Sequence, residues 1–266
     1  MSDKLEISNT FINGSFVDQG DELFQLINPA NESIIGNLKC SSDKQIDEAI
    51  CLTHEAVGCM RSLSRDSRID ILQSIYNQVS EKRDEFGNLI SLEMGAPIEL
   101  AKNAHINMGL DHLTNTINVL KDYKFRVKNE GYDICKISIG AVGLITPWNW
   151  PLNQLFTKVA SAIAAGCSIL VKPSEYSPLS ARLVAEIISK SDLPKGSFNM
   201  INGIGKNMGH LITSDSRLSM ISFTGSTRAG IEIQKSAADT IKKVSLELGG
   251  KSAHIIFNDV EYSDVI

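Results

Sequence analysis

The sequence lacks the patterns that build metal centres and disulfide frameworks. Its five cysteines are scattered over 266 residues without a C-x-x-C pair, and its five histidines include no H-E-x-x-H pair. An odd number of widely spaced cysteines argues against a disulfide framework, and the absence of clustered ligands argues against a zinc site. We therefore expect reduced thiols and no bound metal.

Long hydrophobic runs and an excess of basic residues are also missing. The longest stretch of small apolar residues, VASAIAAGCSILV, is too short to span a bilayer, and the first ten residues are polar, unlike a signal peptide. The 26 basic and 31 acidic residues are interspersed and give a net charge of −5, which leaves no footprint for nucleic acid or an anionic membrane. We expect a cytoplasmic protein with a small-molecule partner.

What the sequence does contain is enough apolar residues for a sizeable core. Hydrophobic residues make up 42% of the chain and charged residues 21%, so one large or two ordinary domains are expected. Near the N-terminus, Asn13-Gly14 lies between apolar residues and predicts a type I′ hairpin turn. Ser42 with Gln45 forms a capping-box pattern, which predicts a helix that runs to about Met60.

The rest of the N-terminal half is predicted to be helical up to one extended segment. Residues 69–86 keep apolar side chains at helical spacing with charges on the other side, and another helix is expected over much of 97–120. The segment 123–139 differs, because apolar residues near its end alternate with period two. We expect this segment to be extended.

From Gly140 onward, short apolar runs alternate with amphipathic stretches. Helical patterns fit near 152–165, 178–190, 205–213 and 226–238, and five runs are predicted to be buried strands: AVGLITP, CSILVKP, SFNMIN, LSMISFTG and KKVSLEL. This alternation predicts an α/β fold, a parallel sheet with helices on both faces. Ligands bind beyond the carboxyl ends of such strands. The chemically notable residues follow those ends: Asn149, Lys172, Gly225, Ser226 and Glu247.

Three of these strand ends carry patterns suited to a nucleotide. The motif NGIGKNMG spaces its glycines one residue wider than the dinucleotide fingerprint, and a tight turn explains them equally well. In FTGSTRAG, Gly225 and Ser226 precede a helix whose free N–H groups suit a pyrophosphate, although a serine N-cap has the same local pattern. Lys172 and Glu175 in VKPSE could bond sugar hydroxyls, or form a solvated pair.

Together the motifs resemble one family. ITPWNWP, AAGCSILVKPSE, NGIGKNMG, ISFTGSTRAG and LELGGKSAHIIF occur in the order and approximate spacing of the NAD(P)-dependent aldehyde dehydrogenase superfamily, and FINGSFV and INPANESIIG resemble its opening. The resemblance covers essentially the whole chain. It implies a hairpin and helical layer of the cofactor-binding domain over 1–122, a bridging or oligomerisation segment over 123–139, a Rossmann-like NAD-binding domain over 140–258, and the start of a truncated catalytic domain over 259–266.

The family's chemistry assigns expected roles to three residues. A cysteine thiolate attacks the aldehyde, hydride passes to the nicotinamide, and water hydrolyses the thioester to a carboxylic acid. Glu247 corresponds to the general base, and an apolar setting that raises its pKa would suit proton abstraction near neutral pH. Asn149 corresponds to the oxyanion donor and Lys158 to a proton relay. The local alternatives are a strand-end capping acid, a turn residue and a helix-surface lysine.

The cofactor residues follow from the same resemblance. Lys172 and Glu175 correspond to the pair that holds the adenosine ribose, and the carboxylate of Glu175 would repel a 2′-phosphate, so NAD is favoured over NADP. Ser226 and Trp148 resemble pyrophosphate contacts. Further positions border the adenine and phosphate channel or line the same cleft: Ile145, Gly205, Gly225, Ala229, Gly230, Leu248 and Gly249. The positions at the aldehyde tunnel are Trp150, Gln154 and Thr157.

One feature of the family has no counterpart in the sequence. The catalytic cysteine should follow the LELGG motif by a few dozen residues, and none of the five cysteines matches that position. Two hypotheses remain. The chain is the N-terminal part of a dehydrogenase that is a homo-oligomer at full length and inactive as this piece alone, or it is a nucleotide- or partner-binding module without dehydrogenase activity. The ending NDVEYSDVI, with Asp259 or Ser263 as a cap, resembles an interrupted helix and favours the first.

Overall fold

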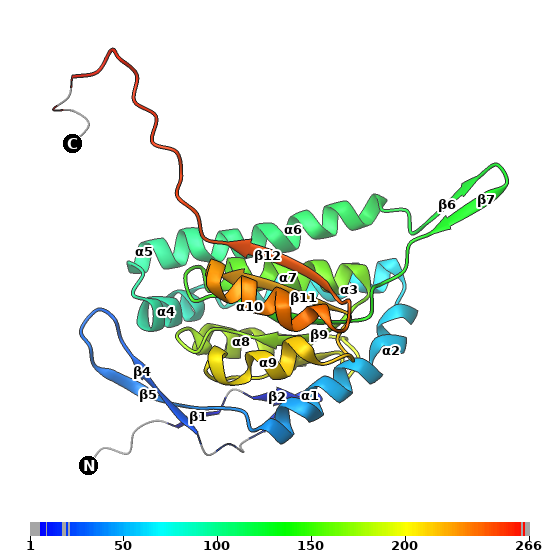
Figure 1. The fold of residues 1–266 in the computed structure, drawn as a ribbon, viewed down its shortest axis with the longest axis horizontal. Helices are drawn as coiled ribbons and strands as arrows, with labels where there is room; N and C mark the ends of the chain where they lie inside the picture. Colours follow the sequence, from blue (N-terminus) through cyan, green and yellow to red (C-terminus); the bar gives the residue numbers. More distant parts are fainter. Residues whose placement is uncertain (1–5, 9, 18–19, 21, 262, 264–266) are drawn as a thin grey trace.

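The computed structural model describes residues 6–8, 10–17, 20, 22–261 and 263. These residues form a central sheet covered by helices, a small N-terminal sheet, and a two-stranded arm that projects from the body (Figure 1). Within this part of the chain, no helix is both long enough and apolar enough to cross a membrane.

The central sheet has the strand order β12-β11-β8-β9-β10-β2-β3. Five strands are parallel, namely β8 (Ala141–Ile145), β9 (Ser168–Lys172), β10 (Phe198–Met200), β11 (Met220–Gly225) and β12 (Lys243–Leu248). The predicted parallel sheet and all five of its strands are therefore confirmed.

The sheet is extended at one edge by the predicted N-terminal hairpin. Strand β2 (Phe11–Ile12) pairs antiparallel with both β10 and β3 (Ser15–Phe16). Asn13 and Gly14 have φ angles of 53° and 87°, which fits the predicted turn with two positive φ values. Residues at the start of the chain thus complete the sheet formed by its second half.

Helices cover both faces of the sheet, as predicted. One core cluster is formed with α3 (Arg65–Glu81), α4 (Arg83–Met94), α6 (Ile106–Asp122), α7 (Pro151–Ala165) and α8 (Pro178–Ser189), and the other with α1 (Asp43–Glu55), α9 (Gly205–Ser214) and α10 (Thr227–Ala238). On β9, Ile169 and Val171 pack into the first cluster and Leu170 into the second, because successive strand residues face opposite ways.

The helices predicted after Gly140 begin and end within one residue of the observed ones, whereas the helices predicted before it are divided, the one over 69–86 into α3 and α4. The capping box is present: the N–H of Gln45 donates to Ser42 Oγ and the N–H of Ser42 donates to Gln45 Oε1. The single helix predicted to reach Met60 is wrong in one respect, because it is divided at Ala56 into α1 and α2 (Val57–Ser62). The helix expected over 97–120 consists of α5 (Ile98–Leu100), a π-helix η1 (Ala101–His105) and α6.

Two parts of the molecule lie outside the central core. Strands β1 (Glu6–Ser8), β4 (Leu23–Ile27) and β5 (Ile34–Lys39) form a separate sheet. The predicted extended segment forms the arm, with β6 (Arg126–Asn129) paired antiparallel to β7 (Tyr132–Cys135). Residues 249–257 after β12 form neither helix nor strand. In the segment 259–266, where a helix is expected to start, residues 259–261 are not helical, and residues 262 and 264–266 lie outside the described residues.

Candidate active site

The carboxyl ends of β8, β11 and β12 meet at a cleft of about 630 Å³, which we call the Glu247 cleft. It brings together nine of the predicted site residues: Trp148, Asn149, Gln154, Thr157, Gly225, Ser226, Glu247, Leu248 and Gly249. The sequence did not predict four others that line it, His112, Pro147, Asn153 and Thr224. The residues that the sequence placed at the strand ends therefore do lie together, at this cleft.

The apolar setting expected for Glu247 is not what the structure shows. Its side chain is exposed, because β12 is the edge strand of the sheet and Glu247 is paired on one side only, to Thr224 of β11. The neighbouring apolar residues in the sequence misled the prediction, since Leu246 faces the other way along the strand. The described residues therefore do not desolvate this carboxylate.

Lys158 is buried beside the cleft rather than lying on a helix surface. Its side chain projects from α7, and its Nζ donates to Ser222 Oγ of β11 at 2.8 Å. Burial lowers the pKa of Lys158 to about 8, although the negative charge of Glu247 acts in the opposite direction. Lys158 is thus an amine that both gains and loses a proton near neutral pH.

The loop that carries Asn149 is held in a strained conformation. Trp150, the N-cap of α7, has φ 133° and ψ 59°, a region that residues other than glycine rarely adopt. Its ring stacks on His105 of the π-helix η1, with centroids 3.9 Å apart and planes 15° from parallel. Asn149 directly precedes this fixed tryptophan and is exposed to the cleft. A lone histidine in a helical pattern offered no signal for this contact.

A second unpredicted histidine lies in the cleft itself. His112 of α6 places Nε2 2.7 Å from Asn153 Oδ1 and 2.8 Å from Thr157 Oγ1. Thr157 also donates to the backbone oxygen of Asn153. Gln154 lies on the same helix, one residue from Asn153, and lines the cleft as well. This wall of the cleft is therefore polar and already hydrogen-bonded.

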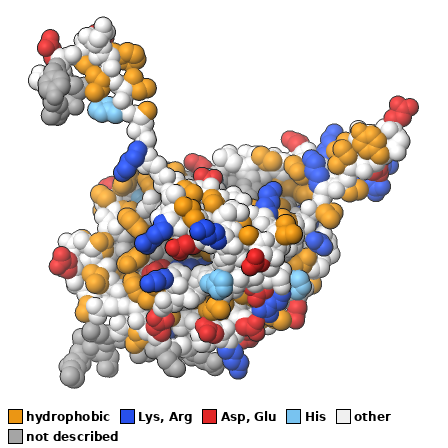
Figure 2. All heavy atoms as spheres, viewed as in Figure 1, with side chains coloured by type: hydrophobic (Ala, Val, Ile, Leu, Met, Phe, Trp, Pro, Cys, Tyr) orange, Lys and Arg blue, Asp and Glu red, His pale blue; other side chains and the backbone are white. Residues whose placement is uncertain are grey.

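A second cleft of about 560 Å³, the Lys172 cleft, opens between α9 and α10. Figure 2 shows the hollow with lysine and arginine side chains at its rim. It contains Ile145, Lys172, Gly205 and Ala229 of the predicted set. The lining residues that were not predicted are Lys206, Gly209, His210, Thr213, Phe223, Arg228, Glu232, Ile233 and Ser236.

Lys172 and Glu175 form a nearly buried ion pair at the base of this cleft. Lys172 Nζ lies 2.8 Å from Glu175 Oε2, the lysine is 4% exposed, and the N–H of Gly205 donates to Glu175 Oε1. Burial lowers the pKa of Lys172. Burial alone would raise the pKa of Glu175, but the Lys172 charge, the hydrogen bond from Lys172 and the backbone hydrogen bonds together outweigh it and lower that pKa. The alternative of a solvated edge pair is wrong.

Glycine occupies the motif positions for a different structural reason in each case. A Cβ on Gly205 would lie 3.8 Å from Lys172 Nζ, an ordinary van der Waals contact, so this glycine lies directly beside the ion pair. A Cβ on Gly230 would lie 2.7 Å from Leu248, so this glycine allows α10 to approach β12 closely. Gly203 has φ 152° beside Met208, which fits the tight-turn interpretation. Ser226 Oγ accepts from the N–H of Ala229 and is the N-cap of α10.

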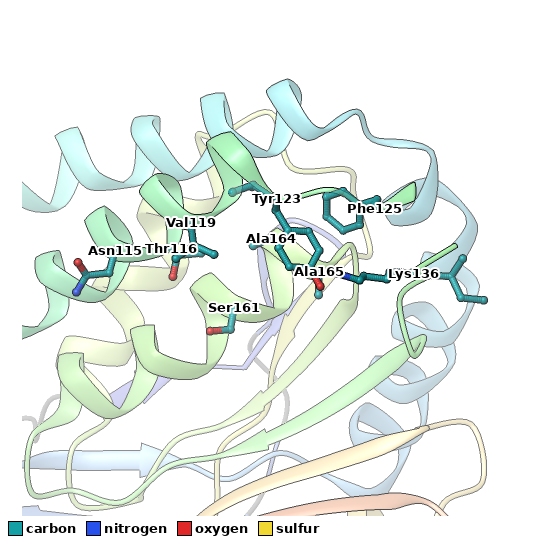
Figure 3. Close-up of a pocket in the computed structure, with 11 residues that line it drawn as sticks. Asn115, Thr116, Val119, Tyr123, Phe125, Lys136, Ser161, Ala164 and Ala165 are labelled. Carbon is teal, nitrogen blue, oxygen red and sulfur yellow. The ribbon is translucent and has the colours of Figure 1, made fainter. Parts of the chain in front are cut away.

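A third hollow, an apolar groove of about 400 Å³, lies away from both clefts between α6, α7 and the base of the arm. Figure 3 shows Tyr123 and Phe125 on one side of it and Lys136 beneath them. The two rings pack edge to face, and Lys136 Nζ lies 4.4 Å from the Tyr123 ring centroid. No predicted site residue lines this groove.

Comparisons with known proteins agree with the motifs. Residues 16–266 match the model of the aldehyde dehydrogenase family. The chain is 39% identical to a 3-succinoylsemialdehyde-pyridine dehydrogenase of Pseudomonas sp. over 96% of its own length and 54% of that protein. It therefore spans about half the length of the curated relatives it matches.

Solved structures show the same relationship. The chain superposes with a TM-score of 0.92 and 40% identity on an aldehyde dehydrogenase from Bartonella henselae, covering 97% of this chain and 56% of that one. It superposes equally well, at 36% identity, on a mutant of aldehyde dehydrogenase C from Pseudomonas syringae in complex with NAD+ and octanal, covering 97% and 53%. On this evidence, the chain belongs to the aldehyde dehydrogenase family.

Proposed function

We propose that this chain forms the cofactor-binding part of an NAD-dependent aldehyde dehydrogenase and supplies its oxyanion donor, Asn149, and its general base, Glu247. The observation that carries the proposal is the placement of Asn149 and Glu247 in one cleft, with the Lys172–Glu175 pair beyond the same edge of the sheet. Membership of the family makes an oxidoreductase the expected class of enzyme. The substrate proposed on the same ground is a small-molecule aldehyde.

The clefts fit NAD. Lys172 and Glu175 would hold the adenosine ribose in the cleft that Lys172 and Gly205 line. Ser226 and the free N–H groups at the start of α10 would meet the pyrophosphate, with Trp148 beside them. The ionised carboxylate of Glu175 disfavours a 2′-phosphate, so we propose NAD rather than NADP. Bound NAD would supply the acceptor for hydride.

The chemistry of this chain's own residues follows from their positions. The side-chain amide of Asn149 would donate to the oxygen that becomes negatively charged when the aldehyde carbonyl is attacked. Glu247 would accept a proton from the hydrolytic water. Lys158, held by Ser222, would relay that proton onward, because its pKa of about 8 allows it to bind and release a proton.

We propose that none of the five cysteines is the nucleophile. None lines the Glu247 cleft. Cys40 and Cys167 are buried and their thiol pKa values are raised by burial, which disfavours the reactive thiolate. The remaining three lie on α1, on α2 and on the arm. Aldehyde oxidation by this chain that disappears when one of these cysteines is changed to alanine would contradict this proposal.

We also propose that the arm, within the segment 123–139, binds other subunits in a homo-oligomer, and that 1–122 and 140–258 form one cofactor-binding domain. Supporting the first, the arm exposes 63% of Tyr132 and 45% of Ile134, and Ile137 beside it is 80% exposed. Supporting the second, β2 pairs with β10 and both parts contribute to the same core cluster.

Calorimetric titration of the chain with NAD and NADP tests the proposed function. We expect NAD to bind with a Kd in the high micromolar range, and NADP to bind about tenfold more weakly because of Glu175. In the variant Glu175→Ala, NAD should bind more weakly and the preference over NADP should disappear. Failure of NAD to bind the folded chain would contradict the proposal.

A further inference from the structure

Helix α8 follows the strand that carries Lys172, and its first turn lacks a local cap. The N-cap residue, Ser177, makes no side-chain capping bond, and Pro178 at the next position has no N–H to donate. The first free N–H groups of the helix are those of Leu179 and Ser180. These are the two positions that an N-cap side chain normally satisfies.

The missing cap is provided by Glu93, near the end of α4 and more than eighty residues earlier in the chain. Its Oε2 accepts from the N–H of Leu179 at 2.6 Å, and its Oε1 accepts from the N–H of Ser180 at 3.1 Å and from Ser180 Oγ at 2.5 Å. The carboxylate is 4% exposed. One buried side chain therefore satisfies both helix donors and a hydroxyl.

Capping a helix with a buried carboxylate costs free energy, because the charged group is removed from water. Burial raises the pKa of Glu93 to about 7, against the three hydrogen bonds that favour the charged form. An aspartate or serine at the N-cap can cap a helix from the surface without burying a charge. A buried cap from another helix does something that a local cap does not do, because it fixes the start of α8 relative to α4.

The start of α8 in turn limits where Glu175 can lie. Five residues, 173–177, join β9 to α8, and they are closed into a turn by bonds from the N–H of Ser177 to Ser174 O and from the N–H of Tyr176 to Ser174 Oγ. At one end, Lys172 is held in β9 by its pairing with Ile145. At the other end, Glu93 is the only side chain among the described residues for which a capping bond to this helix is found.

From this connection we infer that Glu93 is a positioning residue for the cofactor: by capping α8 it holds Glu175 against Lys172 in the orientation that binds the adenosine ribose. The inference rests on the proposed function, since it concerns the affinity for NAD. Glu93 itself touches neither Lys172 nor Glu175 through any recorded bond within the described residues. It acts through the backbone of 175–180.

The test is the Kd for NAD, measured calorimetrically on the folded chain and on four variants: Glu93→Gln, Glu175→Gln, the double variant and Ser64→Ala. Glu93→Gln keeps the size of the side chain but places an amide donor against one helix N–H, and we expect it to raise the Kd about tenfold. In the Glu175→Gln background the same change should raise the Kd less than about twofold, because the group it positions has already been altered. The matched control is Ser64→Ala, which removes the N-cap of α3 and should lower the melting temperature without changing the Kd.

The outcomes separate this inference from the proposed function. If the unaltered chain does not bind NAD, the proposed function fails and the inference fails with it. If the chain binds NAD but Glu93→Gln leaves the Kd unchanged, or raises it equally in the Glu175→Gln background, only the inference fails. Should Glu93→Gln not fold, Ser180→Ala removes a single bond to the carboxylate, and a Kd raised about twofold supports the inference while an unchanged Kd overturns it.

Discussion

The two clefts at the edge of the sheet differ in how they hold their charged groups. In the Lys172 cleft, the ammonium and the carboxylate are paired with each other, and the carboxylate also accepts from the N–H of Gly205. In the Glu247 cleft, the carboxylate is exposed, and among the described residues no hydrogen bond is recorded for it. The site proposed to bind the ribose thus holds its charged groups as a buried pair, whereas the site proposed to react leaves its carboxylate exposed.

Changing the buried pair should have the largest effect. Lys172→Met removes the charge that faces Glu175, and we expect the Kd for NAD to rise about 100-fold and the free energy of unfolding to fall by about 3 kcal/mol. Calorimetry and urea unfolding measure the two quantities. The matched variant in the other cleft, Glu247→Gln, should change the Kd less than about twofold. If both variants weakened NAD binding equally, the two clefts would not differ in their contribution to cofactor affinity.

Lys158 lies between the two extremes, since it is buried but belongs to the open cleft. Its pKa is about 8 in the folded chain against 10.5 for an ordinary lysine amine, so between these pH values the unfolded chain binds the proton that the folded chain has lost. The free energy of unfolding should therefore rise with pH from about 8 to 10.5, by up to about 3 kcal/mol.

The contribution of Lys158 is measured by comparison with Lys158→Met, which keeps the length of the side chain without its charge. Urea unfolding at pH 7.5 and at pH 10 should show the variant to be more stable than the parent at the lower pH, with the difference nearly gone at the higher. Lys172 and Lys242 also have pKa values lowered by burial, so only the difference between parent and variant isolates Lys158. A difference independent of pH would contradict the assignment.

The arrangement of strands and helices was predictable because it rests on local patterns. The central strands β8 and β9 are short, largely apolar runs, since both faces of the sheet are covered there, and the amphipathic helices have an apolar stripe. The capping box at Ser42 and the turn at Asn13-Gly14 are also set by neighbours in the sequence, and both are confirmed. These features depend on interactions between residues that are close together in the sequence.

The features that the sequence did not predict are contacts between distant segments or consequences of strand order. Glu93 and Ser180 are 87 residues apart, and nothing in the pattern around either residue indicates the other. The stacking of His105 on Trp150 joins a π-helix to a loop after β8 in the same way. The exposure of Glu247 follows from the edge position of β12, which depends on the order of all seven strands. The spacing of apolar residues predicts which face of a helix or strand is buried, but not which other elements pack against that face.

The smallest effect should come from Glu247 when stability is measured. Because its carboxylate is exposed and no hydrogen bond to it is found among the described residues, Glu247→Gln should change the free energy of unfolding by less than about 0.5 kcal/mol. Asn149→Ala, in the same cleft, is the matched control and should be equally mild. A loss of several kcal/mol for Glu247→Gln alone would mean that the carboxylate has a structural partner, and the open cleft would then resemble the buried one. A negligible change in the free energy of unfolding would mean that Glu247 does not stabilise the fold, which supports its proposed role as the general base.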